Sequence, residues 1–289
     1  MHIDKALVIG GTGVQGKRWV NNIREVFGIN PFSYGRNYYL IKEQVKDRYF
    51  DLIIVSVPYH AFYSVACALR DLKIRCRYCI LEKPAADNYK TYMDVLNVLR
   101  EHVTDNIYVF LPTRLMVEEA GNFEPQLLVW SVPLPEPATI EGKSFKVPVN
   151  KRIREIDANI VRDLAWHPLA LLPRNKLAIK KYVVLETINR GIPVSCKLEL
   201  VNGCTIVLSR KAGRRQEICF DAAETKCLQL TKLLKHVNWM KIVLEAIKTD
   251  NQEVLGELDA YDLPKKIWRA IDKIVLEIDA QIENAVLLH

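Results

Sequence analysis

Short apolar runs alternate with amphipathic stretches through the first part of the chain. Four of the runs have the length and composition of strands buried on both faces of a parallel sheet. They lie at residues 5–10, 51–58, 78–84 and 107–112. Three stretches between them show the helical spacing of apolar positions, at residues 14–27, 60–72 and 88–101. Strands that alternate with helices predict a doubly wound parallel sheet and the α/β class.

The pattern changes after residue 112, where prolines accumulate. They are spread over residues 124–149, at positions 125, 133, 135, 137 and 148. Prolines mixed with short apolar runs are typical of a boundary between domains. We therefore expect a first domain over residues 1–122 and a second over residues 123–289.

The second domain is predicted to be α+β, with a large open sheet that is mixed or antiparallel. Residues 151–167 have a helical pattern, with an apolar stripe at Ile153, Ile156, Ile160 and Leu164. Strand patterns follow at residues 182–188, 195–201, 204–209 and 216–220. Asn202-Gly203 is a hairpin turn signal. A last helix is expected from a cap at Asp262, with a core stripe at Ile267, Ile271, Ile274, Ile278 and Ile282.

A glycine-rich segment directly follows the first predicted strand. Gly11-Thr12-Gly13-Val14-Gln15-Gly16 reads G-x-G-x-x-G, with a strand before it and a helix after it. In this setting the first glycine makes the turn, the second admits a pyrophosphate, and the third lets the helix pack on the strand. Free N–H groups at the start of the helix would face the phosphates. The segment predicts a dinucleotide site that includes all six residues.

Residues 32–37, where the second strand of the sheet is expected to end, bear on the choice of dinucleotide. A carboxylate that binds the NAD ribose is expected about 20 residues after the glycines, but residues 32–37 contain none. Ser33 and Arg36 lie there instead, and an arginine can bind a 2′-phosphate. We therefore predict that NADP(H) is preferred over NAD(H). The carboxyl end of the next buried run adds to the predicted cofactor site Val57, Pro58 and His60.

Two further motifs supply candidate catalytic groups. Glu82-Lys83-Pro84 closes the third run, where the Lys83 ammonium can hold a substrate oxygen or nitrogen near a nicotinamide. The proline permits a cis bond, and Glu82 and Lys83 are included in the cofactor site. Asp163 and His167 lie one helical turn apart, so Asp163 can orient the imidazole. A histidine with a pKa near ~6.5 can donate and accept a proton at neutral pH.

These three motifs resemble, in the same order, the signatures of the Gfo/Idh/MocA family of NAD(P)-dependent oxidoreductases. The resemblance extends over the whole chain, closely in the first half and loosely in the second. It implies an N-terminal Rossmann domain and a C-terminal domain with a large open sheet. It also implies hydride transfer on a small molecule such as a sugar, polyol or cyclic imine, with Lys83, Asp163 and His167 as the catalytic residues. A homodimer or homotetramer formed through the C-terminal sheet is a further implication.

Residues near these motifs are candidates for substrate contact. They are Lys83, Arg114, Asn159 and Trp166. Asn159 continues the polar line of Asp163 and His167 one turn earlier on the predicted helix, on the wall of a cleft. Trp166 would narrow the pocket or stack on a planar substrate. Pro168 predicts that the helix kinks or ends at His167, because proline lacks the N–H that the carbonyl of Leu164 needs.

Composition limits the alternatives. With 49% hydrophobic and 26% charged residues, the chain is typical of a globular protein. No segment approaches the ~20 apolar residues of a membrane span, and the N-terminus lacks the order of a signal peptide. Seven scattered cysteines indicate a reducing compartment and mostly core thiols, so a cytoplasmic location is predicted. Cys76 and Cys79 form the one close pair, and without a second pair no metal site is predicted.

Two other functions fit parts of the sequence. The net charge of +7 and the basic run Arg210–Arg215 could bind nucleic acid, but the run lies between strand patterns without aromatic residues. We interpret it as a solvated hairpin tip and predict no nucleic-acid partner. The second alternative is a non-catalytic NAD(P)-binding sensor or scaffold, which would bind the cofactor without turnover.

Overall fold

The chain forms two compact units. The computed structural model describes residues 2–35, 48–116, 124–132, 139–140, 143–144, 159–188, 192–210, 213, 215–221, 223–224 and 226–287. Unit 1 comprises residues 1–116 and 237–268, and unit 2 comprises residues 117–236 and 269–289. Among the residues described, no helix is both long and apolar enough to cross a membrane.

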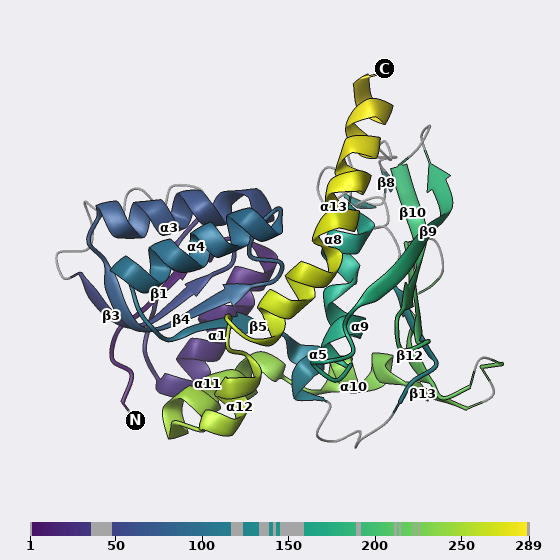
Figure 1. The fold of residues 1–289 in the computed structure, drawn as a ribbon. Coiled ribbons are helices and arrows are strands. Elements are labelled where there is room, and N and C mark those ends of the chain that lie inside the picture. The colour runs from purple at the N-terminus through teal and green to yellow at the C-terminus, as the bar shows by residue number, and fades with distance from the viewer. Residues whose placement is uncertain are drawn as a thin grey trace. The chain divides into compact units, whose positions relative to one another are not determined.

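Unit 1 is built on a five-stranded parallel sheet (Figure 1). Its strands are β1 (Ala6–Ile9), β2 (Phe32–Tyr34), β3 (Tyr49–Val55), β4 (Arg75–Glu82) and β5 (Ile107–Phe110). Their order in the sheet is β2-β1-β3-β4-β5, and every pair is parallel. Since the chain runs outward from β1 to β2 and then returns to the other side of β1, the predicted doubly wound topology is confirmed.

Helices cover both faces of this sheet, with α3 and α4 on one face and α1 on the other (Figure 1). They are α1 (Val14–Phe27), a 3-10 turn η2 (Tyr59–Ala61), α3 (Phe62–Asp71), α4 (Tyr89–His102) and the short α5 (Pro112–Leu115). Local signals set their ends. The side chain of Asn88 caps α4 by accepting from Thr91 N at 2.9 Å, and Gly28 ends α1 at φ 73°.

Residues 237–268 belong to unit 1, which corrects the prediction of a continuous second domain over 123–289. They include α11 (Trp239–Thr249), which packs on α1, and α12 (Gln252–Glu257). Asn238 Nδ2 donates to Asn22 Oδ1 at 2.6 Å. Asp259 forms an isolated antiparallel bridge with Tyr108 of β5, and Ala260 N donates to Ile107 O at 3.0 Å. A single cut in the sequence cannot reproduce a division decided by these long-range contacts.

Unit 2 contains a six-stranded mixed sheet. Its strands are β6 (Leu127–Ser131), β9 (Ile179–Ile188), β10 (Ile192–Leu200), β11 (Thr205–Ser209), β12 (Arg215–Cys219) and β13 (Cys227–Gln229). The order is β13-β12-β6-β11-β10-β9, in which β6 and β11 are parallel and the other pairs antiparallel. The predicted turn at Asn202-Gly203 joins β10 to β11, with Gly203 at φ 87°. A small hairpin of β7 (Thr139–Ile140) and β8 (Lys143–Ser144) is separate.

Two short helices of unit 2 pack on this sheet. The helix α8 (Ile160–Leu164) contacts β10 and β11, and α9 (Trp166–Ala170) contacts β6. A further helix, α10 (Leu230–His236), follows β13, and α13 (Leu263–Leu287) ends the chain. The predicted isoleucine stripe of α13 is confirmed as core at residues 267, 271, 274 and 278, and Ile282 is half-buried. The division between the units falls within α13, between Trp268 and Arg269.

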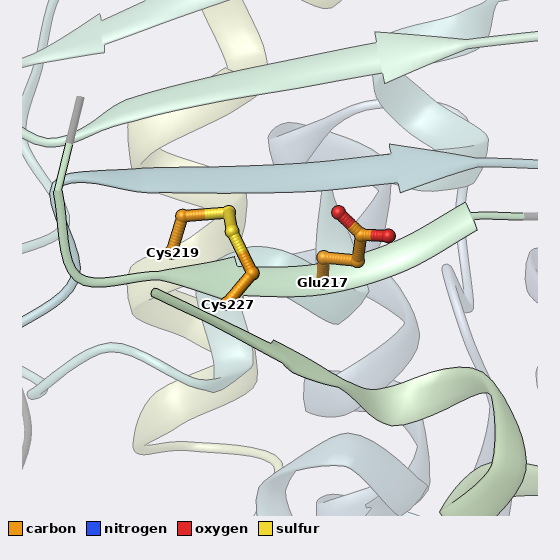
Figure 2. A group of neighbouring side chains, drawn as sticks. All are labelled: Glu217, Cys219 and Cys227. Carbon is orange, nitrogen blue, oxygen red and sulfur yellow. A yellow bond between two sulfur atoms is a disulfide. The ribbon is translucent and has the colours of Figure 1, made fainter. Parts of the chain in front are cut away.

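Cys219 and Cys227 form a disulfide, so the prediction that the cysteines are core thiols is wrong for this pair (Figure 2). The two residues are direct partners across the β12–β13 hairpin, with their Cα atoms 4.1 Å apart. Strand register brings them together, and a separation of eight residues does not reveal that register. The free thiols are Cys67, Cys76, Cys79, Cys196 and Cys204. Burial raises the pKa of Cys196 and Cys204 to about 12. The cysteines therefore no longer argue for a reducing compartment.

Candidate functional site

The glycine loop of unit 1 is tightly folded at the carboxyl end of β1. Gly10 has φ +90°, and a Cβ there would lie 1.9 Å from Ser56 O. A Cβ on Gly11 would lie 2.1 Å from Ser33 Oγ, and one on Gly16 would lie 2.1 Å from Gly10 O. Gly10 and Gly16 therefore exclude any side chain, because backbone atoms fill the space, whereas at Gly11 the Ser33 hydroxyl would have to move. Gly10 is a required glycine that the motif at 11–16 did not include.

The loop lies where the strand order of the sheet reverses, which is the usual ligand position in open α/β sheets. Ser56 N donates to Ile9 O at 2.8 Å, so the ends of β1 and β3 are held together. The four residues that follow Gly11 in the loop, Thr12, Gly13, Val14 and Gln15, are exposed. Val14 begins α1 with 80% of its surface exposed, and the first turn of α1 has no acidic residue. An uncapped helix start behind a side-chain-free loop fits a dinucleotide pyrophosphate.

Other predicted cofactor residues lie on β2 and after the end of β3. Ser33 is exposed on β2 and lies against Gly11. Val57 and Pro58 follow β3, and His60 is exposed in η2. Arg36 lies outside the described residues, so the structure does not test its proposed contact with a 2′-phosphate.

The Glu82-Lys83-Pro84 motif lies at the end of β4, as predicted. The Lys83–Pro84 peptide bond is cis, and Lys83 is half-buried. Glu82 accepts from Trp19 Nε1 of α1 at 2.7 Å, and burial raises the pKa of this carboxyl. Trp268 Nε1 donates to Pro84 O at 3.0 Å. Both tryptophans are fully buried, so they fix the turn that carries Lys83, a role that the sequence did not indicate.

Arg114 has an internal partner that weakens its assignment to the substrate. Its guanidinium pairs with Glu257 of α12, within unit 1, and the arginine side chain is 14% exposed. The ion pair fixes α5 against α12. The structure therefore gives Arg114 a packing role between two helices of unit 1, and its contact with a substrate stays a prediction.

The segment that carries Asp163 and His167 is helical but interrupted, and it differs from the predicted single helix. Residues 151–158 and their two isoleucines lie outside the described residues. The interruption is at Ala165, and the helix resumes through His167 and beyond. Pro168 explains it, because proline provides no N–H for the carbonyl of Leu164, the last residue of α8. The sequence predicts a kink or an end at His167; the helix instead breaks two residues earlier, at Ala165, and then continues through His167 to Ala170.

Two predicted substrate residues of this segment are in the core of unit 2. Asn159 has no exposed surface; its Oδ1 caps α8 by accepting from Val161 N and Arg162 N, and its Nδ2 donates to Val275 O at 2.8 Å. Trp166 is also fully buried. A substrate cannot reach either side chain, so both assignments are corrected to structural roles.

Asp163 has a partner that sequence reasoning missed. Arg210 Nη2 lies 2.8 Å from Asp163 Oδ2, and only 4% of the Arg210 side chain is exposed. The imidazole of His167 stacks on Trp130 of β6, with ring centroids 5.0 Å apart and planes inclined by 16°. Arg210 therefore does not belong to a solvated basic tip. The only sequence signal was its place directly after a predicted strand.

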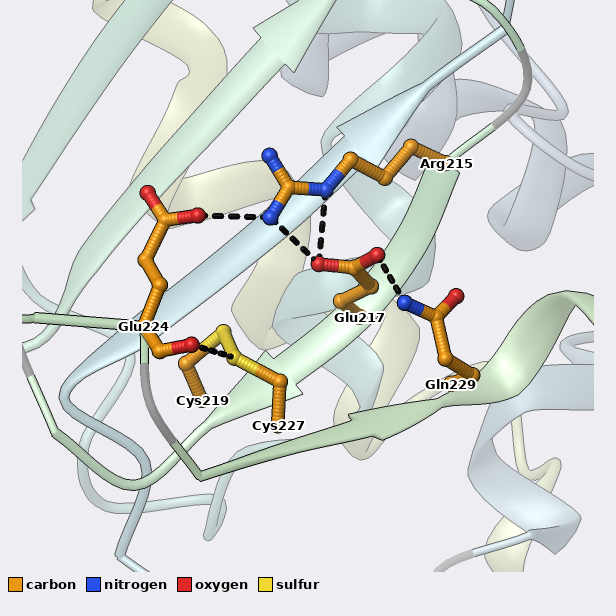
Figure 3. A network of polar contacts seen from close by, with 6 residues as sticks. All are labelled: Arg215, Glu217, Cys219, Glu224, Cys227 and Gln229. Carbon is orange, nitrogen blue, oxygen red and sulfur yellow. Dashed lines mark hydrogen bonds and ion pairs between the residues drawn. A yellow bond between two sulfur atoms is a disulfide. The ribbon is translucent and has the colours of Figure 1, made fainter.

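The other described arginine of the basic run is paired too. Arg215 bonds Glu217 and Glu224, each at 2.6 Å, which holds the pKa of Glu217 below its usual range (Figure 3). Glu217 also accepts from Gln229 Nε2. Glu217, Cys219 and Cys227 are the one group of potential metal ligands among the described residues. The disulfide occupies both sulfurs, so these residues offer no thiolate ligands (Figure 2). Hydrogen bonds from Arg215 and Gln229 occupy the Glu217 carboxylate (Figure 3).

Solved structures of dehydrogenases resemble this one over almost their whole length. UDP-N-acetylglucosamine 3-dehydrogenase GnnA from Acidithiobacillus ferrooxidans matches over 97% of each chain, with a TM-score of 0.62 and 13% identity. The WlbA (WbpB) dehydrogenase from Thermus thermophilus, in complex with NAD and alpha-ketoglutarate, matches over 96% of this chain and 95% of that chain, with a TM-score of 0.61 and 13% identity. Scyllo-inositol dehydrogenase from Lactobacillus casei matches over 98% and 97%, with a TM-score of 0.60 and 11% identity.

The chain has the fold of these dehydrogenases. The fold class that the resemblance to the Gfo/Idh/MocA family implied is therefore confirmed, including the parallel sheet of unit 1 and the mixed sheet of unit 2. At the level of sequence, no family model and no curated protein matches the chain.

Proposed function

We propose that the chain is an NAD(P)-dependent oxidoreductase that acts on a C–O or C–N centre of a small molecule, such as a sugar, polyol or cyclic imine. The observation that carries the proposal is the glycine loop, in which residues 10 and 16 admit no side chain at the point where the strand order reverses. The shared fold supports it, since the similar structures are sugar and polyol dehydrogenases. A bound nicotinamide supplies the hydride acceptor or donor.

The chain's own groups would orient the substrate and move a proton. Lys83, at the end of β4, donates hydrogen bonds to the reacting oxygen or nitrogen and polarises it. His167 exchanges a proton with the same atom as general acid and base, and Asp163 orients the imidazole. The order of the three motifs in the chain supports these roles.

We propose that NADP(H) is preferred over NAD(H). The support is that residues 32–35 offer no carboxylate to bind a ribose hydroxyl and that Arg36 follows them. Similar structures of the enzymes from Thermus thermophilus and Lactobacillus casei were solved with NAD and NAD(H), respectively. Fluorescence titration with NADPH and NADH measures the preference directly. In Arg36→Ala the Kd for NADPH should rise roughly tenfold with that for NADH nearly unchanged, because one charge-assisted hydrogen bond is lost.

Turnover is tested by following NADPH absorbance with a panel of aldoses, inositols, UDP-sugars and cyclic imines. Lys83→Met and His167→Gln should each lower kcat by about 100-fold or more on any active substrate. His102→Gln is the matched control, because His102 is an exposed histidine at the end of α4. Cofactor binding without turnover of any substrate would favour the sensor. Absence of binding at millimolar cofactor would refute both functions.

We also propose a homodimer or homotetramer formed through the sheet of unit 2. The support is that β9 is an edge strand and that Leu185 on it is 52% exposed. Light scattering after gel filtration measures the mass. Leu185→Lys should shift it toward one chain, and a wild-type protein that is already monomeric would contradict the proposal.

A further inference from the structure

An ion pair fixes one of the proposed catalytic groups to the sheet of unit 2. Arg210 directly follows β11, and its backbone N donates to Val194 O of β10 at 2.9 Å. Its guanidinium lies 2.8 Å from Asp163 Oδ2 and is almost completely buried. An arginine remains charged under all physiological conditions. The carboxylate of Asp163 therefore has a fixed cationic partner, and the backbone beside that partner is held by neighbouring strands.

The imidazole of His167 rests on the same sheet. Trp130, on which His167 stacks, is 2% exposed and is paired in register with Leu208, two residues before Arg210. The two ring planes are nearly parallel, so Trp130 defines the plane of the imidazole. Arg210 and Trp130 thus support Asp163 and His167 from adjacent parallel strands, β11 and β6.

Among the described residues, charged groups lie on α8 and on strands that pack near it, and Lys197 and Glu199 of β10 pair with each other at 2.9 Å. The strand β6 carries no titratable residue, and α8 carries Arg162 and Asp163. Arg162 pairs with Asp279 of α13 at 2.6 Å. Asp163 and Arg210 form another pair, so removal of the Arg210 charge takes a buried cation from the Asp163 carboxylate, four residues from His167.

We propose that Arg210 is a positioning residue: it fixes the direction of the Asp163 carboxylate and neutralises its charge, and thereby sets the orientation and protonation of His167. The effect of Arg210 on catalysis rests on the proposed function. The effect of Arg210 on His167 through Asp163 rests on the geometry of unit 2 alone. Arg210 itself does not touch the substrate. The buried cation thus lies beside the carboxylate that is proposed to orient the imidazole.

NMR of the imidazole nitrogens and carbons tests the coupling without any substrate, because the chain has only six histidines. His167→Gln assigns the resonance. In Arg210→Met the pKa of His167 should rise by roughly one unit, because the carboxylate is no longer neutralised. Asp163→Asn should lower it, and Asp163→Asn/Arg210→Met should return it near the wild-type value. Arg210→Lys keeps the positive charge, so the pKa of His167 should stay close to its wild-type value in this variant.

Controls separate this effect from a general disturbance. Lys176→Met removes a cation of unit 2 whose partner, Glu124, is exposed, and should leave His167 unchanged. If Arg210→Met fails to fold, the double variant and Arg210→Lys still carry the test. Two results would overturn the proposal. In one, the pKa of His167 agrees within about 0.2 units between wild type and Arg210→Met. In the other, it agrees to the same extent among wild type, Asp163→Asn and the double variant.

The two proposals can fail separately. Once a substrate is known, Arg210→Met should lower kcat about tenfold or more with little change in KM, and Arg210→Lys should recover most of the rate. A moved pKa without turnover on any substrate would refute the oxidoreductase and leave the coupling intact. Normal turnover with an unmoved pKa would refute the positioning role and leave the oxidoreductase intact.

Discussion

The two candidate regions of this protein are built in different ways. In unit 1 the glycine loop depends on the backbone, because a Cβ at residue 10, 11 or 16 would overlap with neighbouring atoms. In unit 2 the region around Asp163 depends on side chains that lie 47 residues apart in the sequence, since Arg210 follows β11. A site made by backbone sterics leaves a local sequence motif, whereas a site made by distant side chains leaves almost none.

The largest expected effect tests the steric part of this comparison. Gly10→Ala should lower the free energy of unfolding by about 3 kcal/mol or more, because a left-handed φ and an overlap with Ser56 O act together. Urea unfolding followed by tryptophan fluorescence measures the change. NADPH binding should be lost in parallel.

Two other glycines serve as controls for Gly10. Gly28 has φ +73° but open space around its Cα, so Gly28→Ala should cost about 1 kcal/mol. Gly256 lies in α12 with open space, and Gly256→Ala should stabilise by about 0.5–1 kcal/mol. Equal effects at all three positions would refute the steric interpretation.

The next effect concerns the covalent link in unit 2. Reduction of Cys219–Cys227 should destabilise unit 2 by about 2.5 kcal/mol, since the bond closes a short loop in the unfolded chain. Thermal unfolding with and without reductant measures it, and Cys219→Ala/Cys227→Ala should be insensitive to reductant. Cys67→Ser, at a free cysteine of unit 1, should keep the wild-type response. Seven titratable thiols in the unreduced, denatured protein would contradict the prediction.

A smaller effect is expected from the network at Glu217. Arg215 holds the folded pKa of Glu217 below its unfolded value near ~4.3. Its stabilisation is therefore present above that value and lost as the pH falls through the folded pKa. Glu217→Gln should lose about 1.5 kcal/mol at pH 7, at the low end for charged hydrogen bonds because Arg215 is 42% exposed. The deficit should shrink below pH ~4 in urea titrations; a deficit independent of pH would mean that charge is not its cause.

The smallest effect has the opposite sign and lies in unit 1. Burial raises the folded pKa of Glu82, so ionisation becomes unfavourable to the folded state as the pH rises above the unfolded value. Glu82→Gln keeps an oxygen to accept from Trp19 Nε1 and should be more stable at neutral pH, by less than about 1 kcal/mol. The gain should disappear in acid. A less stable variant at pH 7 would show that the charged form of the hydrogen bond outweighs burial.

Much of the fold could be predicted because its signals are local. The strand that ends at Ile9, the helix from Val14 to Phe27 and the turn at Asn202-Gly203 lie where periodicity and turn residues indicated them. The glycine motif and the cis-proline turn at Lys83 were readable for the same reason. Two of the substrate candidates failed, since Asn159 and Trp166 have a polar or aromatic character that does not reveal their complete burial.

The sequence by itself determined the order of strands and helices, the side-chain-free loop and the identity of the groups that could transfer a proton. Only the tertiary structure decided that residues 237–268 join unit 1, that Cys219 lies opposite Cys227, and that Arg210 reaches Asp163. The physical reason is range. Backbone sterics and helical or strand periodicity act over a few residues, whereas strand register and buried ion pairs depend on contacts between segments far apart in the chain.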